Sequence, residues 1–217
     1  MSDLLGFGPS AIPRSLNQYH LAGFTKELAE TLHAMEIYIS MLDRYQRGAL
    51  KNLDLSLIAD QRNIIQHHVI SLPTAAEIKE VFAVNVKGVY EVCRIAALIF
   101  SMGVIFPLQK LCTAYRPLVK QLKLELQELR DTIDIYQPQE LDLVIWATTL
   151  GAIAAKKTPE RSWFVYVLKH LTEYSGLSRW DDLKERLERI LWLRNACNAA
   201  GYQLWLEVQD ADNNECT

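Results

Sequence analysis

Apolar residues recur at three- and four-residue steps along most of the chain, which is the period of amphipathic α-helices. The pattern predicts helices over residues 24–45, 55–72, 74–106, 108–133, 140–155 and 159–174, with further helical segments from 178 to 208. No segment alternates apolar and polar residues between turn residues, as a half-buried strand would. We therefore expect an all-α fold, with a single compact domain of roughly eight or nine packed helices.

Two stretches are apolar on every side rather than on one face. They are residues 95–106, interrupted only by Ser101 and Gly103, and residues 141–155, which contain Asp142. A helix that is apolar all round belongs at the centre of a fold. At about a dozen residues, the stretch 95–106 is too short to cross a bilayer, so we expect no membrane span.

Proline and capping residues set the expected helix boundaries. Pro73 should stop the second helix, because proline disfavours helical geometry in the residue before it. Thr74 and Glu77 have the spacing of a capping box, which predicts that the next helix opens there. Pro117 predicts a break or kink, and Thr158 predicts the cap of the helix over 159–174.

Composition and charge narrow the class of protein. The chain has 217 residues, of which 50% are hydrophobic and 23% are charged, which suits one domain with a substantial core. The formal net charge is −3 and no basic stripe stands out, so we expect no direct binding to nucleic acid. The first residues lack a secretory signal, and we expect an intracellular, cytoplasmic protein. Residues 1–208 should form the helical domain, and residues 209–217 a frayed polar tail.

Metal and enzyme motifs are missing from the sequence. The four cysteines are scattered singly, without the short spacing of a zinc site. The adjacent His67 and His68 would point about 100° apart on a helix, so they cannot both reach one ion easily. There is also no phosphate-binding glycine loop, dinucleotide fingerprint or nucleophile elbow. The sequence therefore predicts neither a metal nor a cofactor.

Several blocks occur in an order and spacing that point to one family. They are 61–67 (QRNIIQH) with 71–73 (SLP), 90–100 (YEVCRIAALIF) ending in 106–107 (FP), 143–146 (LVIW) with 151–154 (GAIA), 160–164 (ERSWF), 180–182 (WDD) and 191–192 (LW). Together they resemble the C-terminal effector domain of fungal zinc-cluster transcription factors, over roughly residues 4–208. No single block is diagnostic, and the resemblance rests on all of them together.

The DNA-binding element of that family, a six-cysteine zinc cluster with a linker behind it, does not occur in this sequence. The resemblance therefore implies no DNA specificity, because the element that reads base edges is missing. The chain is either a fragment of a regulator or a stand-alone protein that keeps the effector domain for another task. Both alternatives stay open at this point.

The resemblance leads to a first hypothesis, a cofactor-free biosynthetic enzyme of fungal secondary metabolism. Genes of the family often lie in natural-product clusters, and a helical pocket that holds a small apolar metabolite could catalyse a cyclisation such as a Diels–Alder reaction. The candidate catalytic donors are His68, Tyr38 and Tyr90. The candidate ligand-binding residues are Met35, Phe100, Trp146 and Trp163.

The second hypothesis is a non-enzymatic regulator, an effector domain that senses a metabolite or acts through a transcription-factor partner or a homodimer. Such a protein would be nuclear. Of the two, the enzyme is favoured here, because a stand-alone effector domain needs a reason to persist. A closed internal cavity with a few polar groups would favour the enzyme, and a filled core together with a large exposed apolar face would favour the regulator.

Charged residues in apolar surroundings complete the set of candidates. Burying a charge is costly unless it is paired, so Arg94 should bridge to Glu91 or to Glu160. Arg161 belongs to the same set of structural ion pairs. These residues lie in the blocks that carry the resemblance, and we interpret them as structural rather than catalytic.

Overall fold

The computed structural model of the chain describes residues 25–51, 54–78, 84–107, 112–130 and 138–211. These residues form eight α-helices and one π-helical turn, without a strand, in one compact arrangement, which confirms the all-α prediction. The elements are α2 (Lys26–Gln46), α3 (Leu55–Ser71), α4 (Val84–Phe100), the π-turn η2 (Ser101–Ile105), α5 (Cys112–Arg130), α6 (Pro138–Ala154), α7 (Arg161–Tyr174), α8 (Trp180–Glu188) and α9 (Arg194–Asp210).

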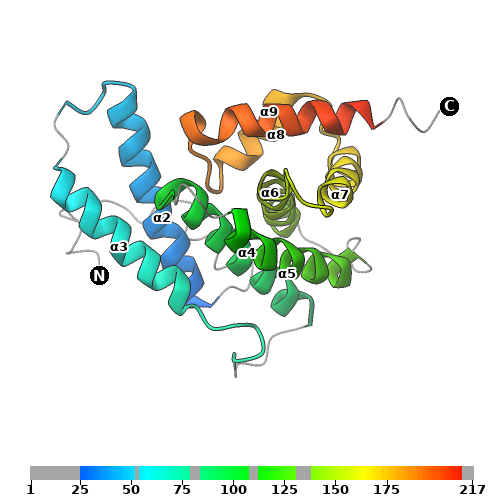
Figure 1. The fold of residues 1–217 in the computed structure, drawn as a ribbon, viewed down its shortest axis with the longest axis horizontal. Coiled ribbons are helices and arrows are strands. Elements are labelled where there is room, and N and C mark those ends of the chain that lie inside the picture. The colour runs from blue at the N-terminus through cyan, green and yellow to red at the C-terminus, as the bar shows by residue number, and fades with distance from the viewer. Residues whose placement is uncertain (1–24, 52–53, 79–83, 108–111, 131–137, 212–217) are drawn as a thin grey trace.

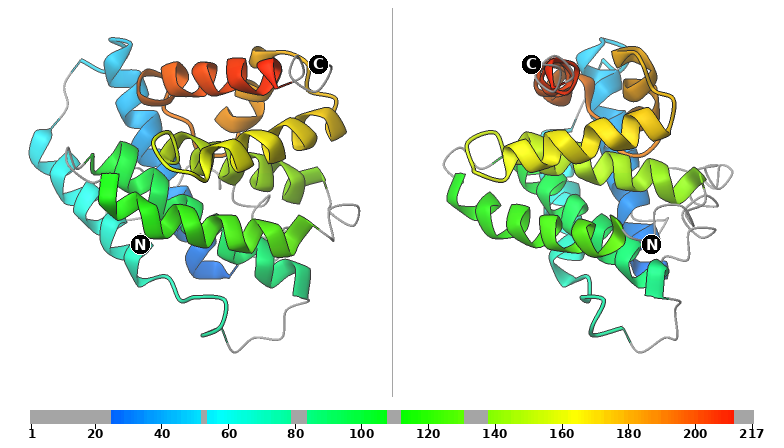
Figure 2. Two further views of the ribbon diagram at one scale, coloured as in Figure 1. Left: turned by 45° about the vertical axis from the view of Figure 1, so that its right-hand side comes forward. Right: turned by 90° about the vertical axis from the view of Figure 1, so that its right-hand side faces the viewer.

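Helices α4 and α6 lie at the centre of the molecule and pack against each other (Figure 1). The hairpin of α2 and α3 lies on one side of α4, and α5 packs against both α4 and α6. Helices α7, α8 and α9 cover the other side of α6, as the turned views also show (Figure 2). Segments far apart in sequence therefore meet around a two-helix centre.

The stretch 141–155 lies at this centre, as predicted, and in α6 every residue from Leu143 to Ala152 is buried. In α4 the fully buried run is Val89 to Ala97. The predicted stretch 95–106 is buried only in part: Gly103 is exposed, and Met102, Val104 and Phe106 are partly buried. By length and composition the stretch Lys87–Ile105 could cross a membrane, but 72% of its most apolar window is buried inside the fold. Burial of that extent is what the core helix of a globular protein shows.

Side-chain caps explain where the first two described helices begin. Thr25 caps α2, because its hydroxyl oxygen accepts a hydrogen bond of 3.3 Å from the Leu28 amide. Asp54 caps α3 in the same way and accepts bonds of 2.9 and 3.3 Å from the amides of Ser56 and Leu57. Helix α3 ends at Ser71, two residues before Pro73, which confirms the predicted stop.

The helix predicted to open at Thr74 does not begin there. Glu77 does reach back, with Oε2 accepting bonds of 2.7 and 2.8 Å from the Thr74 amide and hydroxyl. Residues 75–77 nevertheless form only a turn, in which the Thr74 hydroxyl donates to Glu77 and the Ala75 amide donates to the Glu91 side chain. Helix α4 begins at Val84, and residues 79–83 lie outside the described part of the chain.

Two other boundary predictions are wrong. The break expected at Pro117 does not occur, because α5 continues through this residue, which sits early in the helix and removes only one backbone bond. Thr158 does not cap α7: its hydroxyl donates to the Ala155 carbonyl, and Glu160 occupies the N-cap position. Helix α9 reaches Asp210, two residues beyond the predicted end of the helical domain, and residues 212–217 of the predicted tail lie outside the described residues.

The buried side of α3 is narrower than its sequence indicates. By residue type and spacing, Leu57 and Ile64 belong to the apolar side of this helix, but both are exposed, while Ile65 and Val69 are buried. The reason is that α3 lies at the periphery, where it packs against α2 and one end of α4. Only a narrow stripe of an outer helix can be covered by such neighbours.

Gly151 allows α6 to approach α5 and α7 closely. A Cβ atom there would lie 2.6 Å from Cε1 of Phe164 and 2.7 Å from Cδ2 of Leu122, both of which are fully buried. We expect Gly151→Ala to lower the free energy of unfolding by about 1–3 kcal/mol through overpacking. Urea denaturation measures this directly. Helix propensity alone would raise stability by up to about 1 kcal/mol, so a more stable variant would contradict the close packing.

Candidate functional site

The three candidate catalytic residues lie on three helices and do not form one site. Tyr90 on α4 is buried, and its phenol donates a hydrogen bond of 2.6 Å to the Pro73 carbonyl. The Tyr90 phenol also faces Thr25, at the start of α2. Tyr38 lies thirteen residues further along α2, which is about 20 Å of helix. His68, partly buried on α3, has its closest ring neighbour in His67, with the centroids 6.1 Å apart.

Tyr90 is held as a neutral structural donor. Burial raises its pKa to about 12, an effect that the charge of Arg94 opposes and that of Glu91 reinforces. A phenol with so high a pKa keeps its proton at neutral pH and donates it in a hydrogen bond to the Pro73 carbonyl. It therefore ties α4 to the segment that follows α3.

Replacing Tyr90 by Phe tests this role. We expect Tyr90→Phe to lower the free energy of unfolding at pH 7 by about 0.5–1.5 kcal/mol, since one buried hydrogen bond is lost. The raised pKa makes the contribution of Tyr90 complete below pH 10, its ordinary pKa, and lost as the pH rises through about 12. Denaturation curves of both proteins from pH 7 to 12 check this. If the difference in the free energy of unfolding between wild type and Tyr90→Phe does not become smaller above pH 10, the phenol is not buried and neutral as described.

Tyr38 belongs to a different group of polar side chains, between α2 and α3. Burial raises the pKa of its phenol, while the nearby charge of Arg62 lowers it. The Arg62 guanidinium carbon lies 4.5 Å above the centre of the Phe106 ring, just after η2. Two buried donors in this group, Nε2 of Gln61 and Nε of Arg62, have no hydrogen-bond partner within the described residues. The group is tightly packed, with Tyr38 4% and Gln61 5% exposed.

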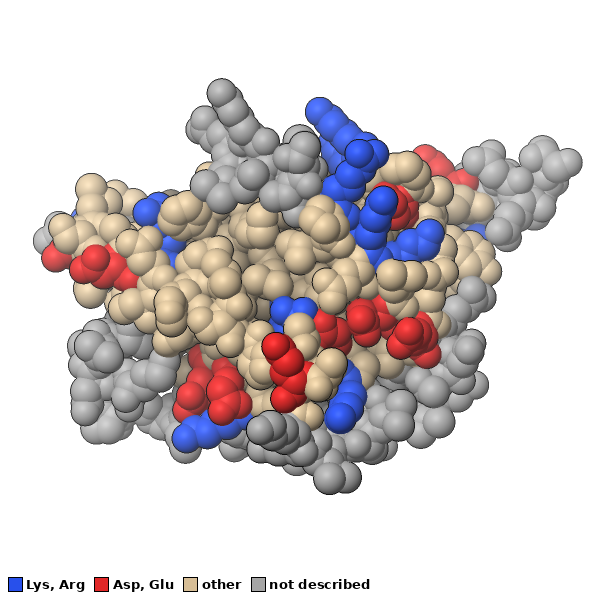
Figure 3. Space-filling view, turned by 60° about the horizontal axis from the view of Figure 1, so that its bottom comes forward, with Lys and Arg blue, Asp and Glu red and all other residues tan. Residues whose placement is uncertain are grey.

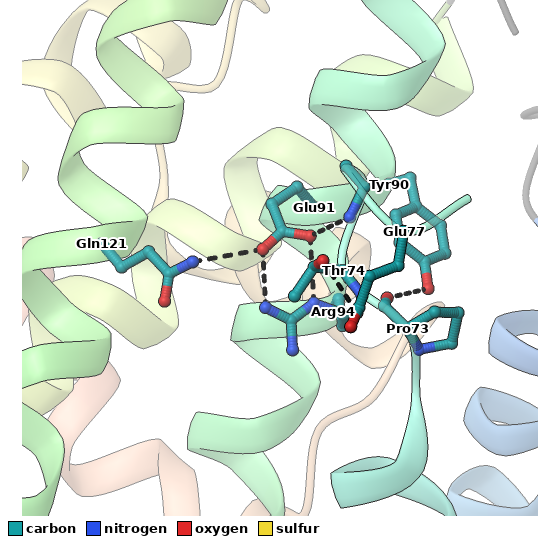
Figure 4. Close-up of polar contacts among 8 residues, drawn as sticks. Pro73, Thr74, Glu77, Tyr90, Glu91, Arg94 and Gln121 are labelled. Atoms are coloured by element: carbon teal, nitrogen blue, oxygen red, sulfur yellow. Dashed lines mark hydrogen bonds and ion pairs between the residues drawn. The ribbon is translucent and has the colours of Figure 1, made fainter. Parts of the chain in front are cut away.

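The most highly connected polar centre of the described chain is the carboxylate of Glu91 (Figure 4). It accepts bonds of 3.0 and 2.6 Å from Nε and a terminal nitrogen of Arg94. It also accepts 2.9 Å from the Ala75 amide and 3.2 Å from the side-chain amide of Gln121. The bridge predicted between Arg94 and Glu91 is thus confirmed, and the alternative bridge to Glu160 is wrong.

This centre is saturated by its own residues. Glu91 is 3% and Arg94 8% exposed, and the carboxylate receives four hydrogen bonds from three separate segments. Burial works to lower the pKa of Arg94, but the hydrogen bonds and charge of Glu91 raise it above its ordinary value. Burial also raises the pKa of Glu125 nearby, with the charges of Glu91 and Glu128 adding to the effect. The arrangement joins α4, α5 and the segment after α3.

Three of the four candidate ligand-binding residues fill the core. Met35, Phe100 and Trp146 are almost completely buried. The indole nitrogen of Trp146 donates a bond of 2.8 Å to the Leu191 carbonyl, between α8 and α9. Trp163 is partly buried, edge-on to the Phe164 ring at 5.0 Å. These aromatic residues pack the helices together, and none of them lines either of the two hollows described below.

The larger of these hollows is an open groove between α7 and α9, which we call the α7–α9 groove. Its volume is about 480 Å³. Its lining consists of Thr158, Pro159, Arg161, Ser162, Val165, Tyr166, Lys169, Glu207 and Ala211. Of these, Arg161 is the one residue among the candidate site residues predicted from the sequence, and its partner was not predicted. The groove exists only where two helices meet, and no periodicity within either helix signals it.

Arg161 braces the α7–α9 groove. Its Nε and a terminal nitrogen donate to the two carboxylate oxygens of Glu207 at 2.8 and 2.9 Å, and its other terminal nitrogen donates to the Ala152 carbonyl. These hydrogen bonds lower the pKa of the Glu207 carboxyl, against its partial burial. A planar guanidinium suits such a two-bond arrangement. Arg161 therefore links the end of α6, the start of α7 and α9, as a structural ion pair with a partner 46 residues away.

A smaller groove of about 280 Å³ lies between α5 and the start of α7. Its lining is Lys120, Lys123, Leu124, Gln127 and Glu160. Glu160 lies in this groove, where the neighbouring polar side chain of Thr158 and its own backbone amide lower the pKa of its carboxyl, and the charges of Lys120 and Lys123 add to this. On the face shown in Figure 3, basic and acidic side chains lie beside one another at several places, and no basic stripe crosses the described part of this face.

Metal ligands do not gather anywhere in the described residues: no group of three or more His, Cys, Asp or Glu side chains could hold an ion. Cys93 and Cys197 are free and buried, and burial raises the pKa of each thiol. A thiol with a raised pKa is a poor nucleophile at neutral pH.

Comparisons with protein-family models, with curated proteins and with solved structures found no match to this chain. The resemblance to the effector domain of fungal zinc-cluster transcription factors therefore stays a prediction from the sequence blocks. Any function has to be argued from the geometry of the chain itself.

Proposed function

We propose that this chain is a helical binding module that takes a small apolar molecule in the α7–α9 groove and carries out no reaction on it. The observation that carries the proposal is the volume and position of this groove, about 480 Å³ between two helices. Small-molecule sites typically measure about 300–1,000 Å³ and have mostly apolar walls with a few polar groups. Pro159, Val165 and Ala211 supply such walls.

The hydrogen bonds that the polar core residues make within the protein support binding without catalysis. A cyclase needs a donor aimed at the reacting group of its substrate. Tyr90 already donates to Pro73, and the Glu91 carboxylate is filled by four internal donors. Tyr38 lies about 20 Å along α2 from the Tyr90 region, so the two phenols cannot act on one small molecule.

The predicted family would give this binding a purpose. An effector domain that senses a metabolite, and passes the signal to a second copy or to a transcription-factor partner, needs a ligand groove but no catalytic residues. The filled positions of Met35, Phe100 and Trp146 agree better with this regulator than with an enzyme that has an internal pocket. The regulator, acting in the nucleus, is therefore the function that we favour over the cyclase.

Binding of a neutral apolar probe tests the proposal. N-phenyl-1-naphthylamine should fluoresce more strongly with the wild-type protein, and Ser162→Phe, which places a ring in the groove, should abolish the increase. Ser178→Phe is the matched control, because Ser178 is exposed and does not line the groove. Equal binding by both variants would move the site elsewhere and contradict the proposal.

Mass spectrometry tests the absence of a reaction. The protein is incubated with extract from a strain that lacks its gene, and the components are followed over time. We expect components to be retained by the protein without conversion. A component that changes retention at unchanged mass would reveal an isomerising cyclase, and the non-catalytic proposal would then be wrong.

A further inference from the structure

The charged side chains of the α7–α9 groove are engaged with the protein itself. Arg161 donates to both carboxylate oxygens of Glu207 at 2.8 and 2.9 Å and also to the Ala152 carbonyl. Lys169, which is buried in the wall of the groove, has a partner within the chain as well. Each charged residue described in the lining is thus partnered, and an ionic ligand would find no uncompensated charge there to hold it.

Glu207 nevertheless keeps the capacity to accept further hydrogen bonds. An ionised carboxylate has about four acceptor positions, and among the described residues only Arg161 donates hydrogen bonds to this one. The side chain of Glu207 is 45% exposed, so the remaining acceptor positions are open to a molecule in the groove. Because the bonds from Arg161 lower the pKa of the Glu207 carboxyl, this group is ionised at neutral pH and only accepts.

These features favour a ligand that donates a hydrogen bond and carries no charge. A ligand hydroxyl would make a charge-assisted bond to the Glu207 carboxylate, which is stronger than a bond between two neutral groups. A ligand carboxylate would be repelled by Glu207, and a ligand ammonium by the guanidinium of Arg161 beside it. The side chains of Pro159 and Val165 consist of carbon only and suit an apolar body.

We propose that the α7–α9 groove selects uncharged apolar molecules that carry a hydroxyl group, such as phenols. The hydroxyl donates to Glu207, and the apolar body lies along Pro159 and Val165. This inference rests on the proposed function, since it names the ligand class of the same groove. It goes further in one respect: a hydrogen-bond donor on the ligand, and not apolar surface alone, decides which molecules bind.

Three naphthalenes that differ in one substituent test the selectivity. 2-Naphthol donates a hydrogen bond, 2-methoxynaphthalene lacks the donor, and 2-naphthoate carries a negative charge. Each competes with N-phenyl-1-naphthylamine for the wild-type protein at pH 7. We expect 2-naphthol to bind at least about fivefold more tightly than the methyl ether, and 2-naphthoate to bind no more tightly than the ether.

Two variants assign the preference to one carboxylate. Glu207→Gln removes the charged acceptor and should reduce the preference for 2-naphthol over the methyl ether to less than about twofold. Glu173→Gln is the matched control, because Glu173 is another exposed carboxylate that lies 3.5 Å from a ring nitrogen of His170 and does not line the groove. This control should keep the wild-type preference, and Ser162→Phe should abolish binding of all three naphthalenes.

The outcomes separate the inference from the proposed function. Equal affinity of the wild-type protein for 2-naphthol and its ether would overturn the hydroxyl preference and leave groove binding intact. Tighter binding of 2-naphthoate than of 2-naphthol, or a full preference kept by Glu207→Gln, would overturn it as well. If N-phenyl-1-naphthylamine itself does not bind, both the inference and the proposed function are wrong. The first comparison uses the wild-type protein, so it does not depend on the folding of any variant.

Discussion

Replacing Glu91 by Ala is expected to lower the free energy of unfolding by about 3–5 kcal/mol, because it leaves a buried guanidinium without its carboxylate. Arg94 is only 8% exposed and donates two hydrogen bonds to Glu91. The Ala75 amide and the Gln121 side chain lose their acceptor at the same time. Urea denaturation followed by circular dichroism measures the change.

Two controls separate the lost pairing from the loss of any side chain. Glu77→Ala removes a carboxylate from the same region that bonds only to Thr74, and it should cost far less than Glu91→Ala. The double variant Glu91→Met with Arg94→Leu removes both charges, and it should be more stable than Glu91→Ala alone. If Glu91→Ala cost less than about 1 kcal/mol, the pair would be solvated and our account of the centre would be wrong.

The Glu91–Arg94 pair also shows what a sequence can predict. The two residues lie three positions apart on a helix, so they are neighbours whatever the rest of the chain does. The cost of burying a charge then makes their pairing an expectation. The other two donors to Glu91 come from residues 16 and 30 positions away. Whether these two donors lie next to Glu91 depends on how α5 and the segment after α3 pack, and local sequence patterns do not determine this packing.

The presence of the helices was predictable because it depends on the local pattern of apolar residues. The residues at which the helices begin and end were harder to predict. The all-round apolar stretch in α6 had to lie at the centre, because no other position buries every face of a helix. At Thr74 and Thr158 the residue types that cap helices are present, but their hydroxyls donate to Glu77 and to the Ala155 carbonyl instead of accepting from a helix amide. Leu57 and Ile64 are apolar but exposed, because the few neighbours of α3 cannot cover them.

For the candidate site, too, local patterns predicted features of single helices but not which helices come together. Tyr38, Tyr90 and His68 are each predicted to lie at or near the apolar face of a helix. That common property does not bring residues from three different helices together in one site. The α7–α9 groove combines residues 158–169 with Glu207 and Ala211, and it depends on the angle and distance between two helices. Arg161 stood out in the sequence as a charge in apolar surroundings, and it turned out to brace that groove.

Trp146 is the second position where we expect a large effect. It is completely buried in α6, and its indole nitrogen donates a bond of 2.8 Å to the Leu191 carbonyl. We expect Trp146→Ala to lower the free energy of unfolding by about 3–5 kcal/mol, since it opens a cavity and leaves that carbonyl without its donor. Chemical denaturation measures the loss.

Trp146 was first predicted to bind a ligand, and its variants distinguish that role from packing. Trp146→Phe keeps most of the apolar volume but removes the indole nitrogen, so it should cost clearly less than Trp146→Ala. If Trp146 only packs α6 against the connection between α8 and α9, folded Trp146→Phe should bind N-phenyl-1-naphthylamine as the wild type does. A variant of unchanged stability that loses probe binding would place the ligand beside α6 instead of in the α7–α9 groove. The two measurements together therefore locate the ligand relative to the core.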